Sequence, residues 1–236
     1  MRLMKNYFLL ALLAVVSIFS CAPEHEMKLT GSIKGLKKGT LLLQKVEDTT
    51  LVSIDSILVN GDANFEFSVT MPSPEVYYLY LRLKNGDLLD ERIPFFAEEG
   101  EMNITTTLDN FGNGYTVTGS KNQEKLNEYK KLIERYADRN VEIVSLRLKA
   151  MAEGNDSMYE VLTKQEERLL RSKYLASVNY ALAQKDFEIA PYIMVNEAEG
   201  LSKKYLDTVY NVLPQNIKNS KYGIDLESLI SKQAVN

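Results

Sequence analysis

The spacing of hydrophobic residues changes once along the 236-residue chain, at Gly119–Ser120. Between Met27 and Gly119, short β-like segments are separated by Gly, Asn and Asp, and apolar residues alternate plainly with polar ones in NFEFSV and in the ITTT of EMNITTT. Roughly eight segments of this kind predict a small antiparallel β-sandwich or β-barrel over residues 27–119.

After Ser120 the apolar residues recur every three or four positions, which is the period of a helix. Ser120 and Gln123 have the spacing of a capping box, and the helix is expected to run to about Ala152. A second helix, capped by Asp156 or Ser157, is expected to reach about Lys185 and to form an antiparallel hairpin with the first. Shorter helices are expected at about 188–197, 202–213 and 224–233, interrupted by Gly200, Pro214 and Gly223. The sequence therefore predicts an α+β chain whose residues 120–236 form a helical domain.

The first twenty residues have the order of a signal peptide. Arg2 and Lys5 precede a run of thirteen mainly apolar residues, and Ser20 stands directly before Cys21, the only cysteine. The run is shorter than the ~20 residues that a membrane-spanning helix needs. Ile18-Phe19-Ser20-Cys21 resembles a bacterial lipobox, so we expect residues 1–20 to be a lipoprotein signal peptide and Cys21 to be acylated.

Lipidation at Cys21 implies attachment to the membrane through acyl chains, with residues 21–26 as a tether. Ala22, rather than Asp, after the cysteine implies the outer membrane by the sorting habit of Gram-negative lipoproteins. Glu24 and Glu26 resemble surface-export signals, and they are also ordinary solubilising residues of a tether. The protein is thus expected to face either the periplasm or the cell surface.

Composition excludes several classes of function. The formal charge is −4, and basic residues are scattered among acidic ones, so no nucleic-acid partner is expected. His25 is the only histidine and falls in the tether, which argues against Ser-His-Asp or Cys-His catalysis and against a zinc site. We expect no catalytic residue, no metal and no cofactor.

Carboxylates are the remaining candidates for chemistry. Six fall near two predicted turns, where they could bind a cation or hydrolyse a glycoside, or could simply form a solvated rim. They are Asp87, Asp90, Glu91, Glu98, Glu99 and Glu101. DNFGNG, residues 109–114, begins like a calcium loop but has Phe111 where an oxygen ligand belongs, which favours a hairpin turn.

Three tyrosines fall in the predicted strand EVYYLYLRL. Alternation places Tyr77 and Leu79 on one face and Tyr78 and Tyr80 on the other. The leucine face is predicted to be core. Tyr78 and Tyr80 are candidate ligand-binding residues, with packing beneath the helical domain as the alternative that we favour.

Long segments also resemble a known family: GSIKGLKKGTLLLQK, DSILVNGDANFEFSVTMPSPEVYYLYL and IPFFAEEGEMNITTTLDNFGNGYTVTGSKNQE. They are similar to the β-domain of unknown function that precedes a thioredoxin-like domain in Bacteroidetes lipoproteins of the thiol-disulfide interchange (TlpA/AhpC) type. KYGIDLESLI resembles the connector into that domain. The sequence has no C-x-x-C motif, so we expect the thioredoxin-like domain, and with it dithiol exchange, to be absent.

These observations favour a lipid-anchored, non-catalytic binding or interaction module of the cell envelope. Two alternatives remain open. One is an accessory protein that acts in trans beside a separate thioredoxin-like envelope protein. The other is a hydrolase that uses carboxylates of residues 87–101.

Overall fold

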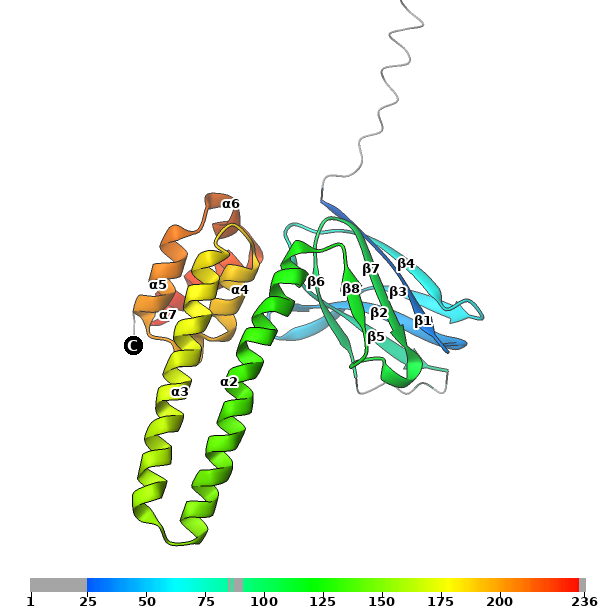
Figure 1. Cartoon of the computed structure of the whole chain (residues 1–236). Coiled ribbons are helices and arrows are strands. Elements are labelled where there is room, and N and C mark those ends of the chain that lie inside the picture. The colour runs from blue at the N-terminus through cyan, green and yellow to red at the C-terminus, as the bar shows by residue number, and fades with distance from the viewer. Residues whose placement is uncertain (1–24, 85, 87–90, 234–236) are drawn as a thin grey trace, which may run out of the picture.

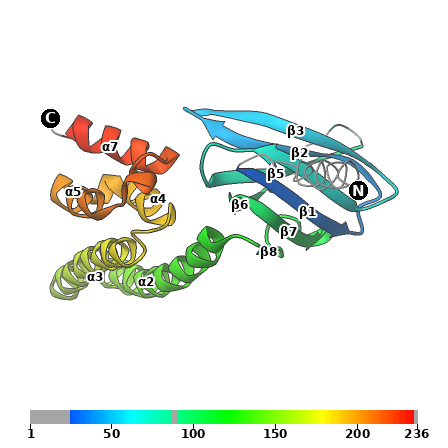
Figure 2. The ribbon, with the colours of Figure 1, turned by 90° about the horizontal axis from the view of Figure 1, so that it is seen from above.

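The computed structural model describes residues 25–84, 86 and 91–233. The signal peptide, Cys21 and most of the tether, as well as Asp87 and Asp90, lie outside the described residues. The described part has a β-sandwich on one side and helices on the other (Figures 1 and 2), which confirms the α+β prediction. Its strands are β1 (Glu26–Lys34), β2 (Lys38–Glu47), β3 (Thr50–Asn60), β4 (Asn64–Thr70), β5 (Glu75–Leu83), β6 (Ile93–Ala97), β7 (Gly100–Thr107) and β8 (Thr116–Thr118).

The strands form two four-stranded sheets, in the orders β4-β1-β7-β8 and β3-β2-β5-β6. Alternate residues of both sheets point into a shared core, including Leu29, Leu41, Phe67 and Leu79. The prediction of an antiparallel arrangement holds for every pair except β1 and β7, which run parallel. Alternation of residues cannot reveal this exception, because it reports which face is buried and not the direction of the neighbouring strand.

The helices are α2 (Lys121–Ala152), α3 (Asp156–Ala183), α4 (Ile189–Asn196), α5 (Lys203–Val212), α6 (Gln215–Lys218) and α7 (Lys221–Gln233). Ser120 caps α2 as predicted, since its hydroxyl accepts a hydrogen bond from the Gln123 N–H at 3.0 Å. The cap of α3 is Asn155 and not Asp156 or Ser157. Its side-chain oxygen accepts from the Met158 N–H at 3.1 Å.

Gly223 does not interrupt the last helix, as the sequence had suggested, but lies inside α7. A Cβ atom on Gly223 would stand 2.2 Å from the Ile217 carbonyl oxygen and 2.5 Å from that of Lys218. This glycine therefore permits α6 and α7 to approach closely.

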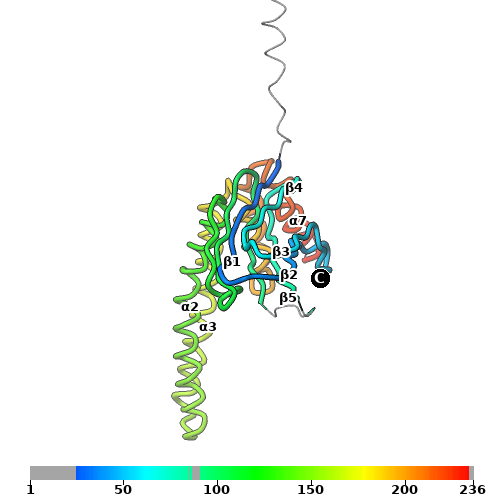
Figure 3. Tube along the Cα trace, turned by 90° about the vertical axis from the view of Figure 1, so that its right-hand side faces the viewer, coloured from blue at the N-terminus to red at the C-terminus, as the bar shows by residue number. Residues whose placement is uncertain are grey.

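The helices α2 and α3 form the expected antiparallel hairpin, and its distal part extends beyond the rest of the described molecule (Figures 1 and 3). A small separate core of Ile143, Ala150 and Leu162 holds the two helices together there. Nearer the sandwich, the helices pack on the outer face of β5 and β6. Val76 and Phe96 of these strands are buried in one core with residues of α2 to α7.

Candidate functional site

Tyr78 and Tyr80 lie on the face of β5 opposite the sandwich core, as predicted. The guanidinium carbon of Arg92 lies 4.7 Å from the centre of the Tyr78 ring and 5.9 Å from that of Tyr80. Tyr78 also packs against the helical core, whereas Arg92 is exposed. A ligand that stacks on these rings would therefore have to accommodate or displace Arg92.

The described carboxylates of the 87–101 segment have different hydrogen-bond partners. Glu91 stabilises the 109–114 turn, because its carboxylate oxygens accept hydrogen bonds from the Gly112 N–H at 3.2 Å and from the Asn113 side-chain amide at 2.9 Å. Glu99 pairs with the His25 ring nitrogen at 2.8 Å, and Glu101 is exposed on β7. The 109–114 segment joins the antiparallel strands β7 and β8, which agrees with the predicted hairpin turn.

Glu98 lies at the N-terminus of α2. Its Oε2 accepts hydrogen bonds from the Ser120 hydroxyl at 2.8 Å and from the Asn122 N–H at 3.0 Å. A carboxylate is stabilised at this end of a helix by the unpaired N–H groups and the helix dipole. Glu98 thus has a structural role that its position in the sequence did not reveal.

Asn122 connects three parts of the chain at this point, and it is only 1 % exposed. Its amide nitrogen donates to Glu188 Oε2 at 2.8 Å and lies 3.3 Å from Glu98 Oε2. Its amide oxygen accepts from the Ile189 N–H at 2.9 Å. One buried amide therefore joins the turn after β6, the start of α2 and the start of α4.

A cleft of about 470 Å³ opens beside Asn122, between the sandwich and the segments that precede α4 and α7. Glu98, Glu99 and Glu188 lie in its wall, together with Lys121 and His25. Burial raises the pKa of the Glu188 carboxyl, and the nearby carboxylates Glu98 and Glu99 raise it further, while the hydrogen bond from Asn122 lowers it. This concentration of carboxylates disfavours anionic ligands in the cleft.

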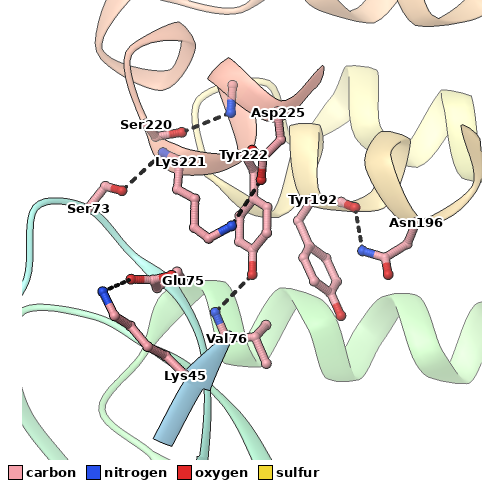
Figure 4. Close-up of polar contacts among 11 residues, drawn as sticks. Lys45, Ser73, Glu75, Val76, Tyr192, Asn196, Ser220, Lys221, Tyr222 and Asp225 are labelled. Atoms are coloured by element: carbon pink, nitrogen blue, oxygen red, sulfur yellow. Dashed lines mark hydrogen bonds and ion pairs between the residues drawn. The ribbon is translucent and has the colours of Figure 1, made fainter. Parts of the chain in front are cut away.

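A second polar contact joins the sheet to α7 (Figure 4). The Tyr222 hydroxyl accepts a hydrogen bond from the Val76 N–H at 3.0 Å, and the Lys221 N–H donates to the Ser73 hydroxyl at 3.1 Å. At the edge of β6, Gln123 Oε1 accepts from the Phe96 N–H at 2.7 Å. The side chains of Tyr222 and Gln123 thus accept hydrogen bonds from backbone N–H groups at the end and edge of the sheet. Such N–H groups are costly to bury without a partner.

Glu75 is the most buried carboxylate near this contact, at 3 % exposure. Its nearest cation is Lys45, whose Nζ lies 3.7 Å from Oε1, and Lys45 also pairs with Glu47 at 3.0 Å. Burial raises the pKa of Glu75, while Lys45 and Lys221 lower it. The burial of Glu75 could not be predicted from the sequence, because the residues that surround it are far away along the chain.

Among residues 25–84, 86 and 91–233, no three His, Cys, Asp or Glu side chains gather closely enough to hold a metal ion. Over the same residues, no helix combines the length and apolar character that crossing a membrane requires.

Residues 27–126 match the profile of a family described as Domain of unknown function (DUF4369), which agrees with the expected uncharacterised β-domain. The matched segment contains the β-sandwich apart from Glu26, and the start of α2 with Asn122 and Gln123 at the junction. A search of curated proteins found no similar sequence.

Proposed function

We propose that this protein is a lipid-anchored component of the cell envelope that acts by binding rather than by catalysis. The basic residues Arg2 and Lys5, the short apolar run and Ser20-Cys21 support acylation at Cys21. Ala22 supports the outer membrane as the destination, with the described domains facing the periplasm or the cell surface.

The anchor is tested by labelling growing cells with radioactive palmitate. The wild-type chain should incorporate label and sediment with membranes, and Cys21→Ser should do neither. Incorporation that persists in Cys21→Ser would contradict the proposal.

The proposed binding role rests on the exposed distal part of the α2–α3 hairpin. Large apolar side chains are exposed on both helices, although such residues normally gather in a core. Val141, Leu148 and Met151 of α2 are 69 %, 49 % and 59 % exposed. On α3, Met158 and Leu170 are also exposed. We infer that the hairpin is the interaction arm of the protein.

Crosslinking in intact cells tests the interaction arm. A crosslinked complex that contains the wild-type chain should be lost with Leu148→Glu, because a charge would have to be buried in the contact. Leu58→Glu is the matched control, since Leu58 is 76 % exposed on the edge strand β3, in the other half of the molecule. Complexes that survive Leu148→Glu unchanged would refute a binding role for the hairpin.

The separate structural partners of Glu91, Glu98 and Glu99 support a non-catalytic role over carboxylate hydrolysis. Glycosidase carboxylates must face one another across the bond that is cleaved. Hydrolytic or redox turnover by the purified chain, abolished by Glu98→Gln without loss of folding, would overturn this part of the proposal.

A second candidate is an accessory role in trans for a thioredoxin-like envelope protein. The match of residues 27–126 to an uncharacterised domain family is compatible with it, as is the resemblance of KYGIDLESLI, in α7, to a connector. Identification of the crosslinked partner by mass spectrometry tests this candidate. Recovery of a protein with a C-x-x-C motif, lost in Cys21→Ser cells, is the expected result.

A further inference from the structure

The helix α2 carries two apolar stripes at heptad spacing. The first faces α3 and contains Tyr136, Ile143 and Ala150. The second stripe consists of Ala137, Val141, Val144, Leu148 and Met151. Ala137, Val144 and Met151 each follow a residue of the first stripe by one position, which rotates them by about 100° around the helix, and Val141 and Leu148 lie on the same face.

Most of the second stripe is uncovered within the described chain, although Ala137 at its start lines a small cavity together with Leu169 and Leu170 of α3. Ala137, Val141, Leu148 and Met151 are exposed and Val144 is half-buried. Spacings of four, three, four and three residues are those of a coiled-coil seam. A helix with two adjacent seams is suited to a bundle in which it contacts two neighbours, and α3 supplies only one.

The residues of the stripe are complementary to a second copy that runs in the opposite direction. If the two stripes cross at Val144, Ala137 of one copy lies opposite Met151 of the other, so the smallest side chain meets the longest. A parallel pairing would instead place Ala137 beside Ala137 and Met151 beside Met151. The antiparallel register therefore fills space more evenly.

Charges at the rim favour the same register. Asp138 and Lys149 border the stripe on one side, six residues before and five residues after Val144, and both are exposed. Antiparallel pairing brings Asp138 of each copy near Lys149 of the other. Parallel pairing at the same level would separate them by roughly 16 Å along the helix axis.

We propose that two copies of this chain associate through the second stripe of α2, antiparallel about Val144, so that their hairpins form a four-helix bundle. This inference rests on the proposed function, in which the hairpin is the interaction arm, and it names the partner as a second copy. The shared hairpin face is about 25 Å long and 20 Å wide, or roughly 500 Å² per copy, which is the size of a weak, reversible interface.

Disulfide crosslinking tests the register. Because Cys21 is the only native cysteine, a Cys21→Ser background leaves an introduced cysteine as the only thiol. In the full chain, purified in detergent, Val144→Cys should form a disulfide-linked dimer under mild oxidation, because the two thiols meet at the symmetry axis. Leu146→Cys, exposed on α2 two residues after Val144 but about 200° further around the helix, is the matched control and should yield several-fold less dimer.

A further variant distinguishes the direction of pairing. Ala137→Cys alone should not crosslink, since its two copies would lie far apart, whereas the double variant Ala137→Cys, Met151→Cys should. Efficient dimerisation of Ala137→Cys alone would show parallel pairing and overturn the proposed register.

The outcomes also separate this inference from the proposed function. If Leu148→Glu abolishes complexes in cells but Val144→Cys gives no more dimer than Leu146→Cys, the hairpin binds another partner and self-association is refuted. If Leu148→Glu has no effect in cells and Val144→Cys does not crosslink, both proposals fail.

Discussion

Glu188 illustrates how one half-buried carboxyl contributes to the pH dependence of stability. Its pKa is raised above the ordinary value of 4.5 by burial and by Glu98 and Glu99. Between pH 4.5 and the raised pKa, the folded chain binds more protons than the unfolded chain. The contribution of Glu188 to stability is therefore present below pH 4.5 and is lost as the pH rises through the folded pKa.

Replacing Glu188 by Gln should remove this loss. Gln keeps an oxygen that accepts from Asn122, so wild type and variant should have similar free energies of unfolding at pH 4. The variant should become the more stable of the two as the pH rises toward 7. Urea unfolding across this range measures the difference, with Glu199→Gln, on an exposed side chain, as the control. A difference independent of pH would show that the Glu188 charge is not responsible.

Tyr222 is a second residue whose contribution to the free energy of unfolding can be measured by a single substitution. Tyr222→Phe removes the hydroxyl that accepts a hydrogen bond from the buried Val76 N–H and should lower the free energy of unfolding by about 1–3 kcal/mol. Thermal unfolding checks this value, and Tyr205→Phe, on a more exposed ring, should have almost no effect. Equal effects of the two changes would contradict the assigned hydrogen bond.

At the scale of elements, Gly223 governs the contact between α6 and α7. Gly223→Ala would improve the helix propensity of α7 in isolation. In the folded chain its methyl group would clash with the Ile217 and Lys218 carbonyl oxygens. We therefore expect a net destabilisation of about 1–3 kcal/mol, from the strain of overpacking.

Chemical denaturation monitored by circular dichroism at helical wavelengths measures this effect. Ser228→Ala, on the exposed face of the same helix, serves as the propensity control and should be neutral or slightly stabilising. Stabilisation by Gly223→Ala would mean that α6 and α7 are further apart than described.

At the scale of the whole molecule, the sandwich and the helices share the core that contains Val76 and Phe96. Separating the two parts would expose Phe96, which is fully buried and packs against Tyr192 and Tyr222 at 5.5 and 5.9 Å between ring centres. We expect the chain to unfold in one cooperative transition for this reason.

Phe96→Ala should destabilise both parts together, by about 3–5 kcal/mol. Tyrosine signals and helical circular dichroism, followed in the same urea titration, should shift to the same lower midpoint. Leu58→Ala, on an exposed side chain, should leave the midpoint unchanged. Two separate transitions would contradict the shared core.

The sequence by itself determined the features that depend on neighbouring residues. Alternation in NFEFSV and EVYYLYLRL identifies which face of each strand is buried, and the cap at Ser120 marks where the helices begin, because both signals act over a few positions. The candidate residues were partly predictable. Tyr78 and Tyr80 lie on the expected face, but their stacking with Arg92 comes from a different segment.

Only the tertiary structure decided which distant groups meet. The parallel pairing of β1 with β7 joins segments about seventy residues apart, as Thr30 and Asn103 show. Asn122 reaches Glu188 across 66 positions, and Tyr222 reaches Val76 across 146. Such contacts form because buried N–H and carboxyl groups must find partners once the cores have closed, and no local pattern in the chain specifies which partner is within reach.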